Sequence, residues 1–314
     1  MGMNIRALDL YIERNLHPLF SASLKGVSQV LLVSNAFSGF LILIGLSLFS
    51  PSLALMALLS SFVGTWISNY VKSNKEAVLD GIFGFNSVLS GVAVTLYLTD
   101  EFKWIVALAA AAVSALFMVA VTNLYSDNKI PILTFPFVMV TWGGILATDN
   151  MKAFHVDPAF KYTRAWYLPS DEDPNFFEGL LKGIGEVFII DSIWAGIFIL
   201  LALFWAGWRF GVYAIWGTII SWSTARILGV DAELLNLGLY NFNAVLSIIA
   251  IGLVFNERKG TFALSSIFAA IMTVPITAGL FVLLQPLGLP ALTMPFILST
   301  WIFLAAWKVR AKEA

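Results

Sequence analysis

The sequence predicts an all-α polytopic membrane protein made of two inverted five-helix repeats, with interrupted or re-entrant half-helices inside the membrane. Hydrophobic residues make up 59% of the chain and charged residues 12%, whereas a soluble domain carries about 25% charged residues. One polar stretch, residues 149–178, divides the long apolar runs into two groups of five. The residues around 130–142 also recur 159 positions later. These three observations indicate a duplicated unit that crosses a bilayer.

The chain begins with an amphipathic stretch. Residues 1–24 mix apolar side chains with Arg6, Asp9, Glu13 and Arg14. Because these charges interrupt any continuous apolar segment, residues 1–24 are predicted to form a surface helix and not a cleaved signal peptide.

Ten apolar runs follow. They lie at roughly 26–49, 52–71, 81–98, 104–125, 131–148, 183–206, 210–226, 235–255, 261–284 and 291–307. A helix needs about 20 residues to span a bilayer, so the shorter runs near 81–98, 131–148 and 291–307 are expected to be half-spans with re-entrant parts. Tryptophans at run ends fit interfacial belts: Trp104, Trp142, Trp208 and Trp307.

The domain organisation follows from these runs. It comprises an N-terminal amphipathic segment (1–24), a first transmembrane repeat (25–148), an extracytoplasmic linker (149–181), a second transmembrane repeat (182–308) and a cytoplasmic tail (309–314).

The most specific signal is a proline motif that occurs twice. The first copy is Ile130-Pro131-Ile132-Leu133-Thr134-Phe135-Pro136-Phe137, and the second is Leu289-Pro290-Ala291-Leu292-Thr293-Met294-Pro295-Phe296; Thr141-Trp142 and Thr300-Trp301 follow them. A proline inside an apolar run removes a backbone N–H and clashes with an earlier carbonyl, so each copy should interrupt or begin a helix. Paired breaks of this kind point to a transport site, although proline-started helices that serve packing alone are the alternative.

The repeat extends beyond the proline motif. Residues 24–30 match 181–187, and residues 85–90 match 242–247, both 157 positions apart. Five runs per half is an odd number, so the halves should be inverted around a central pore. With a cytoplasmic N-terminus, 12 of the 18 basic residues fall on the cytoplasmic side, which favours cytoplasmic positions for both termini.

Composition also excludes several classes of protein. The net charge of -1 suggests no nucleic-acid partner, and the absence of cysteine excludes thiolate metal sites. His17 and His155 lie in polar segments, so no metal cluster or histidine relay is expected in the core. We expect no cofactor and no enzymatic activity, because no nucleophile–base pair can be assembled.

The doubled proline motif, with the paired G-x-Q/E-V and F-N-x-x-L sequences, resembles the urea transporter family over roughly residues 18–308. The resemblance implies one pore per protomer, a homotrimer in the lipid bilayer of the plasma (inner) membrane, and a narrow filter that passes urea without coupling. It also implies a set of residues that line the path. These are Gln29 and Glu186 at the pore wall, Phe85 and Phe242 as slot walls, Thr134, Thr293, Leu89 and Leu246 at the centre, and Val30 and Val187 near the constriction.

The chain departs from the family pattern at two places. Leu32 and Ile189 stand where a second phenylalanine is frequent, so each slot would press a planar solute between one aromatic and one aliphatic wall. Asp191 also adds an acid to the second half, and we expect it to be structural or interfacial.

A urea filter has to replace the water that urea loses, because burying unpaired amide groups costs several kcal/mol. The helix breaks are expected to expose backbone carbonyls for this purpose. Thr134 and Thr293 can donate or accept, or can instead bond a carbonyl of their own helix. Phe85 and Phe242 impose flatness, or serve only packing. Asn86 and Asn243 are expected to cap half-helices and not to contact solute.

Glu186 is the acid most directly tied to function. A carboxyl in an apolar run costs roughly 2.5–3.5 kcal/mol on insertion scales; the alternative is an acid at a helix N-terminus. The preferred function is passive transport of urea and small urea-like amides. An ion- or proton-coupled transporter is the alternative, supported by Glu186 and Asp191 alone, with no embedded Lys, Arg or His expected as a partner. An ammonium-type gas channel would need pore histidines.

Overall fold

The computed structural model describes residues 15–124, 130–148, 150–151, 154–157, 173–256 and 264–313, with side chains described up to residue 306. Within these residues the regular structure is helical apart from one isolated bridge between Leu98 and Val156. The predicted all-α class is confirmed.

The helices of the first half occupy most of the described residues before 149. They are α2 (Pro18–Gln29), α3 (Ala36–Phe49), α4 (Pro51–Tyr70), α5 (Lys75–Leu79), α6 (Phe85–Tyr97), α7 (Lys103–Leu124) and α8 (Phe135–Thr148). Proline begins α2 and α4, where its missing N–H removes no helical hydrogen bond.

The helices of the second half correspond to these in order. They are α10 (Phe176–Gly185) with the short turn η1 (Glu186–Phe188), α11 (Ile193–Ala206), α12 (Trp208–Ile227), α13 (Ala232–Asn236), α14 (Phe242–Ile249) with the π-helical η2 (Ala250–Val254), α15 (Leu264–Leu284) with η3 (Gln285–Leu287), and α16 (Met294–Glu313). The helices α11 to α14 each begin 157 residues after their counterparts α3 to α6, and α16 begins 159 residues after α8.

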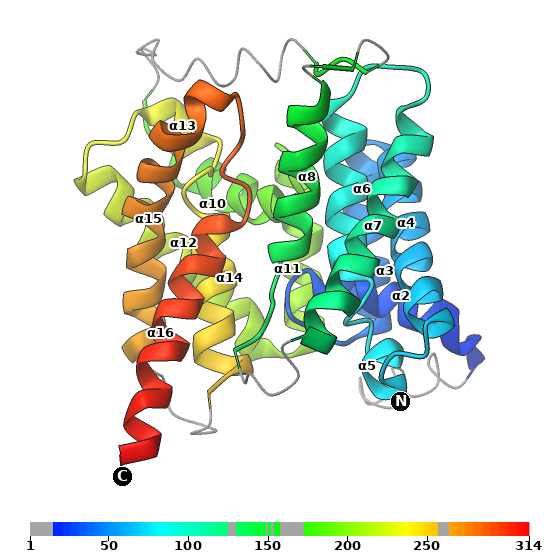
Figure 1. The fold of residues 1–314 in the computed structure, drawn as a ribbon. Helices are drawn as coiled ribbons and strands as arrows, with labels where there is room; N and C mark the ends of the chain where they lie inside the picture. Colours follow the sequence, from blue (N-terminus) through cyan, green and yellow to red (C-terminus); the bar gives the residue numbers. More distant parts are fainter. Residues whose placement is uncertain are drawn as a thin grey trace, which may run out of the picture.

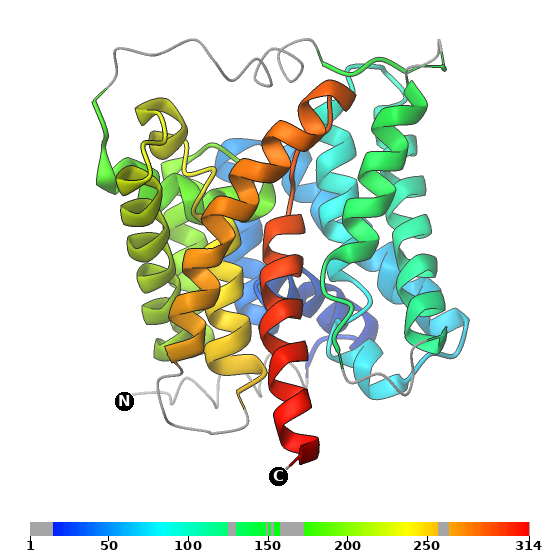
Figure 2. The same cartoon turned by 60° about the vertical axis from the view of Figure 1, so that its left-hand side comes forward.

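Corresponding elements point toward opposite ends of the molecule. In Figure 1, α8 and α16 both begin near mid-height; α8 runs to the top and α16 to the bottom. The short helices α5 and α13 likewise lie at opposite ends, and the turned view in Figure 2 agrees. This is the arrangement expected of a pair of inverted halves.

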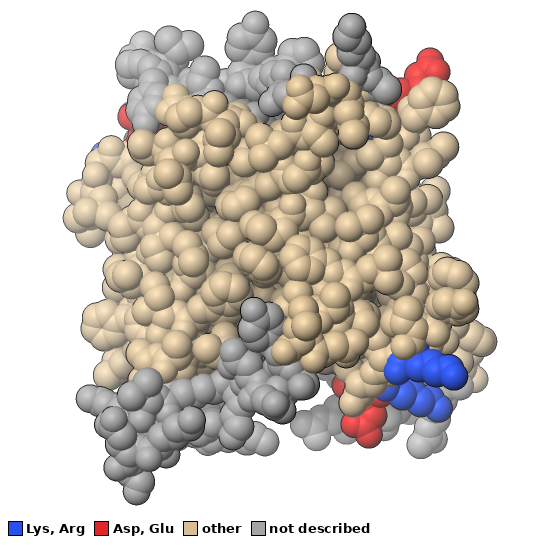
Figure 3. All heavy atoms as spheres, in the orientation of Figure 1, with Lys and Arg blue, Asp and Glu red and all other residues tan. Residues whose placement is uncertain are grey.

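The surface fits a bilayer. On the face drawn in Figure 3, charged side chains of the described residues lie at the upper and lower edges and leave a broad uncharged zone between them. Three described helices are long and apolar enough to span a membrane: α4, α7 and the continuous Leu264–Leu287. Trp104 and Trp208, at helix starts, are exposed beside Lys103 and Arg209, as the interfacial belt predicts.

The first apolar run of each half is broken, which the sequence analysis did not predict. Run 26–49 is divided between α2 and α3, with Leu32 at φ 62°. Run 183–206 is divided at Ile189 (φ 60°), where its two parts are bent by 76°. The polar residues Asn35 and Ser192 cap the second helix of each pair. Each apolar run thus continues across a point at which a helix ends.

Helix α2 also corrects the expected surface segment. Residues 18–24 belong to α2, and Ser21, Ala22, Ser23 and Leu24 are buried in the bundle, so they do not form part of a surface helix. Residues 1–14 of that predicted segment lie outside the described residues.

The two halves meet along α3 and α11. Ser38 Oγ donates to Ala202 O at 2.8 Å, and the rings of Phe37 and Trp205 lie 4.4 Å apart. Gly39 is required on α3, because an added Cβ would collide with the carbonyl of Leu24 on α2. Gly196 meets Leu181 in the same way, so the crossing of the first two helices is the same in both halves.

A short segment after α8 returns to the α6–α7 turn. Asp157 N donates to Tyr97 O at 2.8 Å, and His155 contacts both carboxylate oxygens of Asp100, at 2.6 Å through its backbone N and 3.0 Å through Nδ1. The hydrogen bonds from His155 hold the pKa of Asp100 below its usual value. This segment is therefore anchored at one end of the first half.

Candidate functional site

The two copies of the proline motif meet at a pair of threonines. Thr134 and Thr293 lie immediately before α8 and α16, both are buried, and their Oγ1 atoms are 2.7 Å apart. The hydroxyls thus bond one another across the two halves. Each threonine follows a leucine in the left-handed region, Leu133 at φ 56° and Leu292 at φ 51°. That conformation costs a non-glycine residue about 1–2 kcal/mol, so neighbouring groups must hold it.

One asparagine from each half holds each break. Asn86, on α6, donates through Nδ2 to Leu133 O at 3.1 Å and accepts through Oδ1 from Phe137 N at 3.1 Å. Asn243, on α14, contacts Leu292 O at 3.2 Å and Phe296 N at 3.1 Å. The amide oxygens satisfy N–H groups in the first turns of α8 and α16, which have no partner within their own helix. Both asparagines therefore cap half-helices, as expected, although each caps a helix other than the one on which it lies; that they make no contact with solute stays a prediction.

Two tryptophans cross between the halves. Trp142, on α8, donates through Nε1 to Pro290 O at 2.7 Å, and Trp301, on α16, donates to Pro131 O at 2.8 Å. The prediction of Trp142 as an interfacial residue is therefore wrong, because its indole N–H points to a backbone carbonyl of the other half. Trp307 of that prediction has no described side chain. The matched position of Trp142 and Trp301 in the motif was the available signal.

The backbone carbonyls at the breaks are already used by the protein. Pro131, Leu133, Pro290 and Leu292 each accept a hydrogen bond from a Trp or Asn side chain. The expectation that the breaks expose open carbonyls is corrected at these four positions. A carbonyl oxygen has two lone pairs, so each keeps one further acceptor site.

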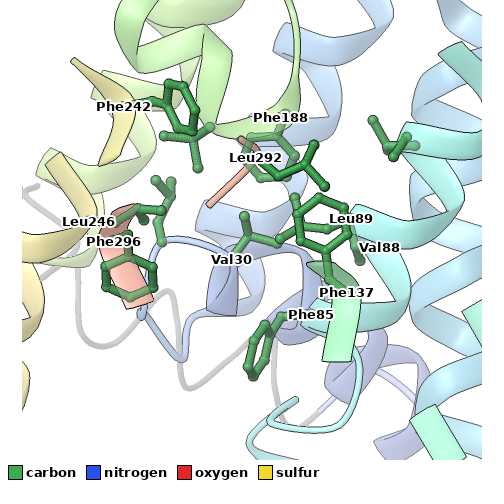
Figure 4. Packing of buried hydrophobic residues seen from close by; sticks show 14 of the residues in the cluster. Val30, Phe85, Val88, Leu89, Phe137, Phe188, Phe242, Leu246, Leu292 and Phe296 are labelled. Carbon is green, nitrogen blue, oxygen red and sulfur yellow. The ribbon is translucent and has the colours of Figure 1, made fainter. Parts of the chain in front are cut away.

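Apolar side chains surround the threonine pair. Phe85 and Phe242 are the first residues of α6 and α14, Leu89 and Leu246 lie one turn further, and all four are buried. Figure 4 shows Phe242 at one end of this cluster and Phe85 at the other, with Leu89 and Leu246 between them. The rings of Phe137, Phe188 and Phe296 also lie between Phe85 and Phe242 in this view.

The remaining predicted apolar residues come from the broken first runs. Val30 and Val187 are buried, and Figure 4 places Val30 near the middle of the cluster. Leu32 and Ile189 occupy the left-handed turns and are partly buried. Sequence reasoning missed Phe188, which is fully buried in the same cluster. It lies inside an apolar run, so no pattern marked it.

Gln29, in the first half, binds the backbone of the turn that follows α5. Its Nε2 donates to Asp80 O at 2.9 Å, and Ser34 Oγ donates to Asp80 Oδ1 at 3.2 Å. Gln29 ends α2, and Asp80 follows α5. The side-chain amide therefore ties the broken first run to the turn before α6.

Charged side chains lie near Glu186 in the second half. Lys182 Nζ lies 2.9 Å from Asp191 Oδ1 and 2.9 Å from Glu178 Oε1. Lys182, on α10, stands one turn before Glu186, and the ion pairs that it forms are with Glu178 and Asp191. Glu186 caps the C-terminal end of α10, which contradicts its alternative role as an acid at a helix N-terminus. The nearby ammonium group offsets the unfavourable helix dipole. Asp191 is half-exposed and bridges the bend, as its structural interpretation requires.

Comparisons with known proteins place the chain in a family. A family model described as "Urea transporter" matches residues 20–308. Similar curated proteins include Urea transporter 1 of Ovis aries and of Capra hircus, each 28% identical over 291 residues, and Urea transporter 1 of Rattus norvegicus, 28% identical over 295 residues. Each similarity covers 90% of this chain and 75% of the relative.

Proposed function

The chain belongs to the urea transporter family, and from this premise we propose that it conducts urea passively along a path through the Thr134–Thr293 pair. The family is one of transporters, so the protein is not an enzyme. The finer parts of the proposal are the passive mechanism, the lining residues, and small urea-like amides as further solutes.

The hydroxyl pair is the observation that carries the proposal. Thr134 and Thr293 share a single hydrogen bond at 2.7 Å, and each hydroxyl can donate once and accept twice. A urea molecule that enters between them exchanges this one bond for a bond to each hydroxyl. Because hydrogen bonds are traded and not lost, the net free-energy change is small. A small change favours passage over tight binding.

The apolar residues around the pair supply selectivity. Phe85 and Phe242 present flat rings at the two ends, and Leu32 and Ile189 are proposed as the facing walls. Val30, Val187, Leu89 and Leu246 offer no hydrogen bonds, so an ion that entered would lose its water without replacement, at a cost far above that for a neutral amide. Gln29 and Glu186 are proposed to accept urea N–H groups at the mouths.

A coupled transporter is the second candidate, favoured by the ionic cluster of Lys182, Asp191 and Glu178 beside Glu186. Coupling requires an ion or proton to pass the centre as well as one mouth. The proposed central residues of the described chain carry hydroxyl or hydrocarbon side chains, which favours passive conduction.

Urea flux into proteoliposomes separates the two candidates. Passive conduction predicts the same initial urea flux with proton and sodium gradients imposed or dissipated, measured by light scattering against protein-free liposomes. A flux that collapses with either gradient would support coupling. Transport of N-methylurea and acetamide in the same vesicles tests the proposed range of amide solutes.

We also propose that three copies assemble in the plasma (inner) membrane with both termini cytoplasmic. Large apolar side chains are exposed along one side of α4, including Leu55, Leu59, Phe62 and Trp66, and such faces have to contact lipid or protein. Cross-linking in native membranes tests the trimer: a ladder that ends at the dimer would contradict it.

A further inference from the structure

We propose that Trp142 and Trp301 are positioning residues that set the spacing of the transport path at Thr134 and Thr293. The inference rests on the proposed function, because it assigns the two indoles a role in the path described above. Neither side chain is placed in contact with the solute. Each acts through the backbone of the opposite half.

The contacts are reciprocal. Trp142 lies eight residues after Thr134 and bonds Pro290 O, three residues before Thr293; Trp301 lies eight residues after Thr293 and bonds Pro131 O, three residues before Thr134. The two bonds, at 2.7 and 2.8 Å, are short for an N–H donor. Each half-helix therefore holds the break that precedes the other half-helix.

Each indole bond attaches to the turn that precedes a threonine of the path, so it can control the position of that threonine. A proline carbonyl begins each turn that leads through a left-handed leucine to the threonine. Asn86 and Asn243 secure each turn from within its own half, whereas the tryptophans secure it against the other half. Thr134 and Thr293 belong to different halves, so the distance between them depends on how the two halves are placed. A bond between the halves therefore controls this distance.

Packing alone does not account for the two indoles. A tryptophan in an interfacial belt directs its N–H to water or headgroups, whereas a buried tryptophan bonds an acceptor of the protein, which can be any nearby one. Both Trp142 and Trp301 are partly buried and direct the N–H to a carbonyl of the other half. Trp301 also packs on Phe135, with ring centroids 5.6 Å apart, so its ring and its N–H have separable roles.

The first experiment removes the N–H and keeps an aromatic ring. Trp142→Phe and Trp301→Phe are each expected to lower the ratio of urea to N-methylurea permeability about five-fold, the loss that corresponds to one net hydrogen bond. Trp66→Phe is the matched control, because Trp66 is exposed on α4 and stacks on Tyr70; it should leave the ratio unchanged. Benzothienylalanine at position 142, which replaces the indole N–H by sulfur, tests the same loss if the Phe variant fails to fold.

The double variant distinguishes a shared role from two local ones. If both indoles set one distance, losing either releases it, and Trp142→Phe/Trp301→Phe should lie within about two-fold of the single variants. Independent local effects would multiply to about 25-fold. A multiplied loss, or single variants with the wild-type ratio, would overturn the inference.

A cross-linking assay tests the spacing without transport. The chain has no native cysteine, so Thr134→Cys/Thr293→Cys reports the separation of the two positions through the rate of disulfide formation. We expect Trp142→Phe to slow that rate about five-fold and Trp66→Phe to leave it unchanged. An equal rate of disulfide formation with Trp142 and with Trp142→Phe would overturn the positioning role. A wild-type protein that conducts no urea would refute the proposed function but would leave this cross-linking test intact.

Discussion

The centre and the mouths of the proposed path differ in how closely the two halves agree. At the centre, Asn86 and Asn243 make equivalent bonds of 3.1 and 3.2 Å to leucine carbonyls, and the two indole bonds measure 2.7 and 2.8 Å. At the mouths, Gln29 bonds the backbone of Asp80, whereas Glu186 lies beside an ionic cluster. The matched central residues are therefore the same in both halves, whereas Gln29 and Glu186, which are matched at the mouths, differ.

The difference teaches where the duplicated fold constrains its sequence. The asparagine bonds stay within one half, but the threonine pair and the two indole bonds join the halves to each other, so a change in one half has to suit the other. The contacts described for Gln29 and Lys182 lie within their own half, so these residues are less constrained by the other half. Acids lie near the break in both halves, but Asp80 is matched by Leu237 and Asp191 by Ser34, so these acids come from different elements in the two halves.

The largest expected effect tests the equality of the centre. Asn86→Ala and Asn243→Ala each leave a buried carbonyl and a buried N–H without their partner, and each should lower the free energy of unfolding by about 3 kcal/mol. Denaturant unfolding in detergent measures this, with Asn74→Ala, an exposed cap of α5, as a control that should cost about 1 kcal/mol. Clearly unequal losses for Asn86 and Asn243 would break the comparison.

The next prediction tests whether the two mouths share one role. Glu186→Ala should lower urea flux about ten- to one hundred-fold through loss of a hydrogen-bond acceptor, whereas Glu186→Gln should keep most of the flux because it restores the chemistry of Gln29. Flux is measured at matched protein content between pH ~5 and ~8, with exposed Glu233→Gln as the control. A Gln variant as inactive as the Ala variant would show that the carboxylate itself is needed.

The slots should respond alike in both halves. Phe85→Ala and Phe242→Ala remove the flat walls, and each should raise the permeability of N-methylurea relative to urea about ten-fold, within the range for reshaped apolar pockets. Competition flux in proteoliposomes measures the ratio. Wild-type selectivity in both variants would show that the slot assignment is wrong.

The smallest effect concerns the acid found in one mouth alone. Asp191→Ser gives the second half the residue of the first half, and Lys182 keeps Glu178 as a partner. Because Asp191 is 44% exposed, we expect a loss of unfolding free energy below about 1 kcal/mol, and a smaller loss in high salt. A salt-independent loss above that value would show that the ion pair organises the bend.

Sequence reasoning reached the features that repeat and missed those that depend on long-range geometry. The doubled motif located Thr134 and Thr293, and the spacing of Asn86 and Asn243 supported their capping role. Hydropathy did not detect the turns at Leu32 and Ile189, because a left-handed residue can be as apolar as its neighbours. Lys182 and Asp191 are nine positions apart, and they meet because the chain bends between them.

The ionic cluster at one mouth makes the two ends of the proposed path different, which bears on the direction of urea movement and on the binding of blockers. In a path without coupling, the same barriers are crossed in both directions, so the different mouths cannot favour net movement either way at equal urea concentrations. They can still make the two sides of the protein pharmacologically distinct, because a blocker occupies a mouth without crossing. A blocker that binds Asp191 can therefore reach it from one side of the membrane alone. The urea flux, in contrast, depends on both mouths, because urea crosses the whole path.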